Sequence, residues 1–395
     1  MSRITTKSRL FCVVTLTLAL ACTAPAAVAP SAPPKRPPLL IHVMPWFSAD
    51  AKSLGWHWTM NQTAEQVRAS GRVASHFRPL IGPYDSLDPD LIELQVVWMK
   101  LAGFDGVLAD WYGTQSHFDY PMIHERTKAL FDVATKAGLS IGVVYEDQTV
   151  GNAIREKLIT PDQAIPIARQ TGQFLAKEWF PRPNWLRIKG KPAVLVFGPQ
   201  YFKEPEWAAF RQAAGDYQLL TLHKTRPFSQ GGYDWPIPSL GMKFTDEFGA
   251  RSKDWAIRIP VAFPRFKDFY ASAGQKGYPE LPDRDGQTYR DTLAQAIALA
   301  PDAVQVATWN DWQEGSQIEP SVELGIRDLI ATQDARRKLD PRFRFTPRDL
   351  DLPLTLYQFR KKMANPAQLQ PLAEALLQGK IDYVRRQLPL LKDEK

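Results

Sequence analysis

Short apolar runs alternate with amphipathic segments along most of this chain, and that alternation constrains the fold more than any other feature. Eight runs are short enough to be single strands, at residues 39–46, 104–111, 139–146, 192–198, 218–223, 239–244, 257–263 and 303–310. Helical patterns lie between them at 88–102, 127–138, 160–179, 204–215 and 289–300. Because no glycine-rich phosphate loop follows a strand, an open doubly wound sheet is disfavoured. The pattern predicts an α/β fold, a (β/α)8 TIM barrel over residues 39–343.

The pattern changes after the eighth predicted strand. Apolar spacing typical of helices recurs at 352–362 and 367–388, with no further strand between them. Residues 344–395 are therefore predicted to form a C-terminal helical extension on the outside of the barrel.

The first residues resemble a bacterial export signal. Arg3, Lys7 and Arg9 precede an apolar run at 10–21 that is too short to span a bilayer, so residues 1–21 are predicted to be a signal peptide. Ala19-Leu20-Ala21-Cys22 is similar to a lipobox, which predicts lipidation of Cys22. Cleavage after the same alanine without lipidation is the alternative. We expect an exported periplasmic or outer-membrane lipoprotein that meets a membrane only through this lipid.

The next segment, 22–38, is rich in proline and alanine and should be an extended tether. Cys12 lies inside the predicted signal peptide, which leaves Cys22 as the mature chain's sole cysteine. A disulfide framework and a cysteine nucleophile are then excluded.

Histidine spacing and the distribution of charge bear on metal, cofactor and nucleic-acid sites. The six histidines show no HExxH-type spacing, so we predict neither a metal site nor a cofactor. The net charge of +7 is spread along the chain instead of forming a basic stripe, which argues against a nucleic-acid partner.

Carboxylates and aromatic rings stand at the ends of the predicted strands, where barrel enzymes carry their chemistry. They suit a glycan site, which needs stacking faces and hydroxyl partners. Taken singly, each has a structural reading as a packing ring, a cap or a solvated loop charge. The substrate-binding candidates before the eighth strand are Trp46, His57, Asp110, Trp111, Tyr112, Tyr145, Glu146 and His223.

The eighth predicted strand leads into a pair of carboxylates, Asp311 and Glu314, flanked by Trp309 and Trp312. Two carboxylates beside aromatic rings are typical of enzymes that break glycosidic bonds. The tryptophans are predicted to form an apolar wall that keeps Glu314 protonated, helped by the charge of Asp311. Asn310 is predicted to bind a sugar hydroxyl, and Trp309 and Trp312 are further candidates for substrate binding. An N-cap and its companion at a helix start would produce the same spacing.

The stretch from Trp309 to Pro320, WNDWQEGSQIEP, resembles the Trp-Asn-Glu-Trp-His-Glu-Gly-Thr-Gln-Ile-Glu signature of the endo-α-mannosidases, glycoside hydrolase family 99. Aspartate as the first acid is more similar to the α-1,3-glucanases, family 71. Supporting similarities span residues 39–330 in the expected order and occur at 44–47, 56–58, 83–88, 102–107 and 110–113.

This resemblance implies a (β/α)8 barrel that acts on α-linked glycans. It assigns Glu314 as general acid/base, and Asp311 as the carboxylate that takes a proton from the sugar's own 2-hydroxyl, so that a transient epoxide forms. Asp311 departs from the endo-α-mannosidase pattern because it is one methylene shorter than glutamate. Activation of a water by Asp311 in an inverting reaction is therefore an open alternative.

The leading hypothesis is a glycoside hydrolase, endo-acting on an oligo- or polysaccharide of the α-mannan or α-glucan type. Two alternatives remain. One is a non-catalytic glycan-binding lipoprotein on the same barrel, which the shortened Asp311 motivates. The other is a protein of surface-polysaccharide assembly, against which export argues.

Overall fold

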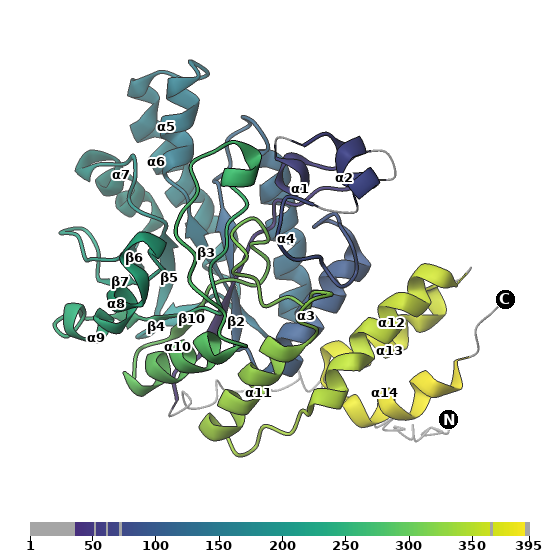
Figure 1. The fold of residues 1–395 in the computed structure, drawn as a ribbon. Helices are drawn as coiled ribbons and strands as arrows, with labels where there is room; N and C mark the ends of the chain where they lie inside the picture. The colour runs from purple at the N-terminus through teal and green to yellow at the C-terminus, as the bar shows by residue number, and fades with distance from the viewer. Residues whose placement is uncertain (1–35, 51–52, 61, 71–72, 364–365, 392–395) are drawn as a thin grey trace, which may run out of the picture. The chain divides into compact units, whose positions relative to one another are not determined.

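The computed structural model describes residues 36–50, 53–60, 62–70, 73–363 and 366–391 (Figure 1). The predicted signal peptide, Cys22 and the tether up to residue 35 lie outside the described residues. None of the described helices is long and apolar enough to cross a membrane.

Parallel strands form the centre of the fold, in the order β8-β7-β6-β5-β3-β2-β1-β10-β9. β8 and β9 are separated by Pro260 alone; β8 pairs with β7 and β9 with β10. β8 and β9 are thus two halves of one barrel strand, so the closed sheet has eight strands. This confirms the predicted TIM barrel. β4 (Arg187–Ile188) forms a small antiparallel hairpin with β5. The barrel strands are β1 (Leu39–Val43), β2 (Gly106–Trp111), β3 (Ser140–Tyr145), β5 (Lys191–Val196), β6 (Gln218–Leu222), β7 (Gly231–Tyr233), β8 (Arg258–Ile259), β9 (Val261–Ala262) and β10 (Val304–Val306).

The predicted sixth strand at 239–244 is wrong. That stretch forms a 3-10 turn, Pro238–Leu240, followed by helix α8, Gly241–Asp246. The sixth barrel strand is β7, and its two glycines conceal the strand pattern in the sequence. A Cβ on Gly231 would lie 2.3 Å from the carbonyl oxygen of Ile257, and one on Gly232 would lie 2.6 Å from the Trp255 ring. The close approach of Ile257 and Trp255 therefore leaves no room at positions 231 and 232 for the β-branched side chains that are typical of a strand.

Helices surround the barrel (Figure 1). α11 follows β10 and was not predicted, because its buried residues include Asp328, Thr332, Gln333 and Arg336. A largely polar buried face leaves no apolar periodicity to detect. The outer helices are α3 (Pro89–Ala102), α4 (Tyr120–Lys136), α6 (Ala164–Phe174), α7 (Glu204–Ala214), α10 (Gln287–Ala298) and α11 (Arg327–Leu339). The short helices α1 (Trp56–Thr59), α2 (Ala64–Ser70), α5 (Gln148–Arg155) and α9 (Phe248–Arg251) lie in the loops.

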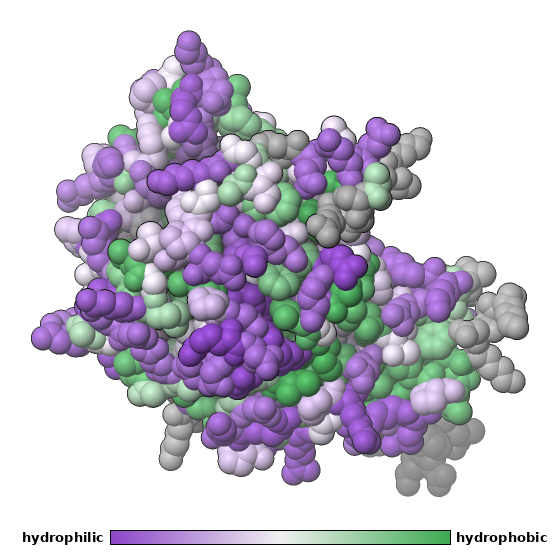
Figure 2. Space-filling view, in the orientation of Figure 1, coloured by the Kyte–Doolittle hydropathy of each residue, from purple (hydrophilic) through white to green (hydrophobic). Residues whose placement is uncertain are grey.

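The C-terminal helices are α12 (Asp351–Lys362), α13 (Gln370–Leu377) and α14 (Ile381–Gln387). α12 and α13 lie beside α3, and α14 contacts α13 (Figure 1). Arg360 bridges to Asp90 at 2.9 Å and to Glu93 at 2.8 Å, both on α3. The predicted helix 367–388 is divided in two because Gly379, at φ 73°, ends α13. On the face shown in Figure 2, hydrophilic residues cover most of the surface, with hydrophobic ones among them where α12 and α13 lie.

Alternation along the strands separates two cores and thereby positions the site. Leu40 on β1, Leu108 on β2 and Val144 on β3 belong to the cluster inside the barrel. Their strand neighbours Ile41, Val107 and Val143 pack outward in the helix-facing cluster.

At the floor of the barrel, where the strands begin, Asp105 ties the start of the described chain to α11. Its carboxylate accepts two hydrogen bonds from Arg36 and two from Arg336, at 2.8 and 3.0 Å in each case. These bonds hold the pKa of Asp105 below its usual range.

Candidate active site

Four carboxylates gather at the carboxyl-terminal ends of the strands. Asp110 is the penultimate residue of β2, Glu146 follows β3, and Asp311 and Glu314 follow β10. Asp110 lies two residues after inward-facing Leu108, so its side chain faces the barrel interior. The pKa of Asp110 is raised well above its ordinary value by burial and by the charges of Glu146 and Asp311, which places these acids in one electrostatic neighbourhood. The structure therefore brings Asp110 and Asp311, which are 201 positions apart in the sequence, into one acidic cluster.

Asp311 both caps a turn and belongs to the acidic cluster. Its Oδ1 accepts a hydrogen bond from the Glu314 backbone N–H at 3.1 Å, and its own N–H donates to Thr308 Oγ1 at 2.8 Å. This bond closes a turn at residues 312–315, and no helix starts there, so the helix N-cap interpretation is wrong in that respect. Burial raises the pKa of Asp311 to about 7, so the group changes charge near neutral pH.

Glu314 is half-buried at the mouth of the barrel. Burial and the charge of Asp311 raise the pKa of Glu314 well above its ordinary value, and a hydrogen bond from the Tyr270 hydroxyl, 3.1 Å from Oε1, opposes the rise. A carboxyl in this setting holds its proton at neutral pH and can donate it.

Glu146, which follows β3, is a further member of the acidic cluster. Burial raises its pKa to about 8, although Gln148 donates a hydrogen bond of 2.6 Å to Oε2. Below it, His42 Nε2 lies 3.9 Å from Asp110 Oδ1, and burial lowers the pKa of His42 to about 3. The imidazole is therefore neutral and does not neutralise the acids. Tyr112, half-buried, feels the charges of Asp110 and Glu146.

Trp46 and His57 lie next to the loop that carries Glu314. Their rings stack with centroids 4.5 Å apart and planes 9° apart. His57 Nδ1 is 3.2 Å from Oε1 of Gln313, and its Nε2 is 3.6 Å from an Asp119 carboxylate oxygen. Both rings are half-buried, so each keeps some surface for a ligand.

His223 marks the end of β6. It adopts a positive φ of 62°, which is uncommon for a residue with a side chain. Nδ1 lies 3.0 Å from Asp234 Oδ1, and Arg251 Nη2 contacts both oxygens of the same carboxylate at 3.0 Å. The His223 ring is thereby fixed, with its side chain 26% exposed.

Two predicted ligands face the wrong way. Trp111 and Tyr145 are fully buried in the helix-facing core, where the Trp111 ring lies 4.8 Å from that of Trp179. Each is the strand neighbour of an inward-facing acid, Asp110 or Glu146, so alternation turns it outward. Neither ring can stack on a glycan at the barrel mouth, and their assignment as substrate-binding residues is corrected.

The neighbours of the acid pair are supports and not ligands, which corrects the roles predicted for Trp309, Asn310 and Trp312. All three are buried, with relative exposures of 0%, 1% and 0%. Trp309 packs toward Trp98 of α3 at 6.5 Å, on the helix side of the barrel. The Asn310 amide bonds to the backbone N–H and C=O of Met44 at 2.7 and 3.0 Å. These contacts fasten the end of β10 to the end of β1.

A buried carboxylate that the sequence did not single out anchors this support. Glu319 accepts hydrogen bonds from Tyr84 Oη at 2.7 Å, Gln95 Nε2 at 2.6 Å and Trp312 Nε1 at 3.1 Å. Burial raises the pKa of Glu319 to about 7. Its place inside the twelve-residue signature was the only available signal.

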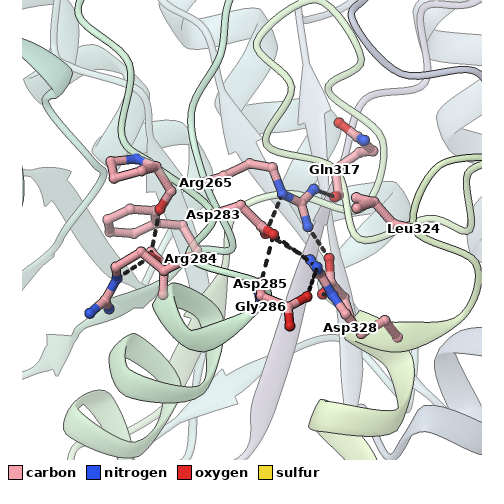
Figure 3. A network of polar contacts seen from close by, with 12 residues as sticks. Arg265, Asp283, Arg284, Asp285, Gly286, Gln317, Leu324 and Asp328 are labelled. Atoms are coloured by element: carbon pink, nitrogen blue, oxygen red, sulfur yellow. Dashed lines mark hydrogen bonds and ion pairs between the residues drawn. The ribbon is translucent and has the colours of Figure 1, made fainter.

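A second polar network, centred on Arg265, holds the loop after β10 at Gln317 (Figure 3). Arg265, 2% exposed, donates to the Gln317 carbonyl at 2.7 Å and to Asp283 at 2.9 Å, and it also pairs with Asp328. Arg327 binds Asp283 at 2.7 and 2.8 Å. Within the part of the chain that the structure describes, no group of three His, Cys, Asp or Glu is arranged to hold a metal ion.

Several known proteins are similar to this chain. No family model matches the chain. A glycoprotein endo-alpha-1,2-mannosidase-like protein of Danio rerio is 26% identical over 278 residues, which are 63% of this chain and 60% of the relative. The glycoprotein endo-alpha-1,2-mannosidase of Mus musculus is 22% identical over 314 residues, 69% of this chain and 65% of the relative. This chain thus spans less than two thirds of the length of these relatives.

Among solved structures, the GH99 endo-alpha-mannosidase from Bacteroides thetaiotaomicron aligns with a TM-score of 0.58 and 20% identity, over 76% of this chain and 97% of that one. The resemblance to the endo-α-mannosidase group is confirmed, as is its barrel fold. The similarity to the α-1,3-glucanases stays a prediction.

Proposed function

We propose that this chain is a glycoside hydrolase that cleaves α-mannose-containing glycans at internal linkages, with Glu314 as general acid/base and Asp311 as its partner. The observation that carries the proposal is the electrostatic coupling of these two carboxyls after β10. Burial and the Asp311 charge favour the protonated form of Glu314, the form a leaving glycosidic oxygen requires. The names of the relatives supply the α-mannose part.

In the proposed reaction Glu314 gives its proton to the departing oxygen as the bond to the anomeric carbon breaks. As a carboxylate it can then accept a proton from an incoming water. Asp311 acts on the nucleophile with the oxygen that does not cap the turn. It either takes the proton of the sugar's 2-hydroxyl, which closes an epoxide on the anomeric carbon, or takes a proton from water that attacks directly.

The product configuration separates the two routes. An epoxide is formed and opened by two inversions, so the first product has the α configuration of the substrate. Direct attack by water inverts once and releases the β anomer. NMR of the newly formed reducing end, recorded before mutarotation, decides between them.

The decisive variant is Glu314→Gln, which keeps the side-chain shape and removes the acid. We expect loss of turnover on α-mannose oligosaccharides, with glycan binding retained in calorimetry. Glu280→Gln is the matched control, because Glu280 is exposed and pairs with surface Lys267 at 3.4 Å. Hydrolysis by Glu314→Gln at the wild-type rate would overturn the assignment.

A non-catalytic glycan-binding protein is the second candidate, favoured by the turn-capping bond that occupies one oxygen of Asp311. It predicts calorimetric binding of mannose oligosaccharides without release of new reducing ends by the wild-type chain.

We also propose export and lipidation at Cys22, on the basis of the lipobox-like sequence Ala19-Leu20-Ala21-Cys22. Metabolic labelling with a fatty acid should mark the wild-type protein and not Cys22→Ala. Cys12→Ala, altered inside the predicted signal peptide, is the control and should remain labelled. Absence of label from the wild type contradicts the proposal.

A further inference from the structure

We propose that Tyr270 is a positioning residue for Glu314 that fixes which carboxyl oxygen carries the transferable proton; this inference rests on the proposed hydrolase function. The Tyr270 hydroxyl donates to Glu314 Oε1 at 3.1 Å. Burial and the charges of Glu314 and Asp311 raise the pKa of Tyr270 above its ordinary value. Tyr270 therefore stays protonated and acts as a constant donor to Oε1.

The loop that carries Tyr270 is held against the loop that carries Glu314 by backbone contacts. Lys267 N–H donates to the Glu314 carbonyl at 2.7 Å, and Phe269 N–H donates to the Gln313 carbonyl at 2.8 Å. Gly315 permits this approach, because a Cβ there would lie 2.6 Å from the Lys267 carbonyl oxygen. These backbone contacts fix the position of Tyr270 relative to Glu314, so the place of its hydroxyl does not depend on the side chain alone.

A second contact shapes the turn on which Tyr270 sits. The Asp268 carboxylate accepts the backbone N–H of Tyr270 at 3.0 Å and that of Tyr278 at 2.7 Å. The two ends of the turn are therefore held by one side chain, which keeps the tyrosine directed at Glu314.

The chemical consequence follows from counting protons and lone pairs. A protonated carboxyl has one hydroxyl oxygen, which donates, and one carbonyl oxygen, which accepts. Since Tyr270 donates to Oε1, Oε1 is the carbonyl oxygen and the proton of Glu314 lies on Oε2. When the proton leaves, the Tyr270 bond remains and stabilises the carboxylate against burial and the nearby Asp311. Tyr270 thereby sets both the place of the proton and the ease of its release.

The test is Tyr270→Phe, which removes only the hydroxyl, beside Tyr278→Phe as matched control. Tyr278 lies in the same loop, is 52% exposed and stacks edge-on to Tyr270 at 6.2 Å. Loss of a hydrogen bond to a carboxylate should raise the pKa of Glu314 by about one unit and move the alkaline limb of kcat to higher pH. At the optimum, kcat on a natural glycan should fall roughly tenfold or more, with KM little changed.

Leaving-group dependence sharpens the result. An aryl mannoside with an acidic phenol needs little proton donation, so Tyr270→Phe should cleave it at nearly the wild-type rate. Equal losses on the aryl substrate and the natural glycan would mean that Tyr270 only maintains the fold, and the proposal would be overturned.

A titration without turnover separates this proposal from the proposed function. Carbon-13 labelling of glutamate carboxyls, with Glu314 assigned through Glu314→Gln, reports the pKa of Glu314 by NMR in wild type and Tyr270→Phe. A higher pKa in the variant supports the positioning role even if no glycan is cleaved. An unchanged pKa refutes it, whether or not the wild-type chain hydrolyses glycans.

Discussion

Replacing Tyr84 with phenylalanine tests the buried support beneath the acid pair. The Tyr84 hydroxyl donates to Glu319 at 2.7 Å and accepts from Asn310 Nδ2 at 3.1 Å and Trp312 Nε1 at 3.2 Å. Each partner keeps another bond in its absence: Gln95 still binds Glu319, Met44 still binds Asn310, and Glu319 still binds Trp312. The variant therefore loses three hydrogen bonds, of which the one to Glu319 is the shortest, and leaves no buried group wholly unpaired.

The cost should depend on the charge of Glu319, whose pKa is raised by burial to about 7. Below that pH the folded protein holds a neutral acid, and a neutral hydrogen bond is worth about 1 kcal/mol; above it the bond is charge-assisted and worth about 1.5–3 kcal/mol. Tyr84 lowers the pKa of Glu319, so its removal raises that pKa and penalises the carboxylate form. The loss of unfolding free energy must therefore grow as pH rises through 7.

Urea unfolding followed by tryptophan fluorescence measures this directly, at about pH 5.5 and about pH 8.5 on either side of the transition. Tyr278→Phe, altered at an exposed tyrosine, is the control and should be neutral at both pH values. An equal cost for Tyr84→Phe at the two pH values, or a cost below about 0.5 kcal/mol, would refute the account of Glu319 as a buried, hydrogen-bonded acid.

Three further outcomes are expected. Gly315→Ala should reduce kcat strongly, because Gly315 has a φ of 64° and an added Cβ would press on the Lys267 carbonyl. Gly325→Ala is the control, since Gly325 has a φ of 56° and open space around it. Equal activity of the two variants would contradict the close approach of Gly315 to Lys267. Trp46→Ala should weaken glycan binding measured by calorimetry, whereas Trp111→Phe should affect stability alone; the reverse pattern would contradict the placement of these rings. The free energy of unfolding should fall as pH rises from about 4.5 to 8, because the folded-state pKa of Glu146 is raised to about 8 and the unfolded chain releases that proton first. Glu146→Gln should flatten this slope in urea titrations, and an unchanged slope would show that Glu146 is not the source.

The barrel was predictable because most of its strands are long enough to appear as apolar runs in the sequence. β7 was not, because its glycines are dictated by atoms of Ile257 and Trp255, which are remote in sequence. α11 escaped detection because its buried face is polar and makes ion pairs such as Arg336 with Asp105 at 2.8 Å. Both failures come from tertiary contacts that overrule local pattern.

The acid pair was likewise visible in the sequence, since strand ends in a barrel converge. The side on which each aromatic ring lies was not. Asp110 and Trp111 are consecutive, and only the register of β2 decides which one faces the interior. Tyr270 gave no signal, because its contact with Glu314 depends on how two loops pack and not on any spacing within either.

The bonds that Asp105 makes with Arg36 and Arg336 give the barrel a fixed polarity. They secure the incoming chain at the strands' starting edge, whereas the acids occupy the finishing edge. The described chain therefore begins at the end of the barrel opposite the acid pair.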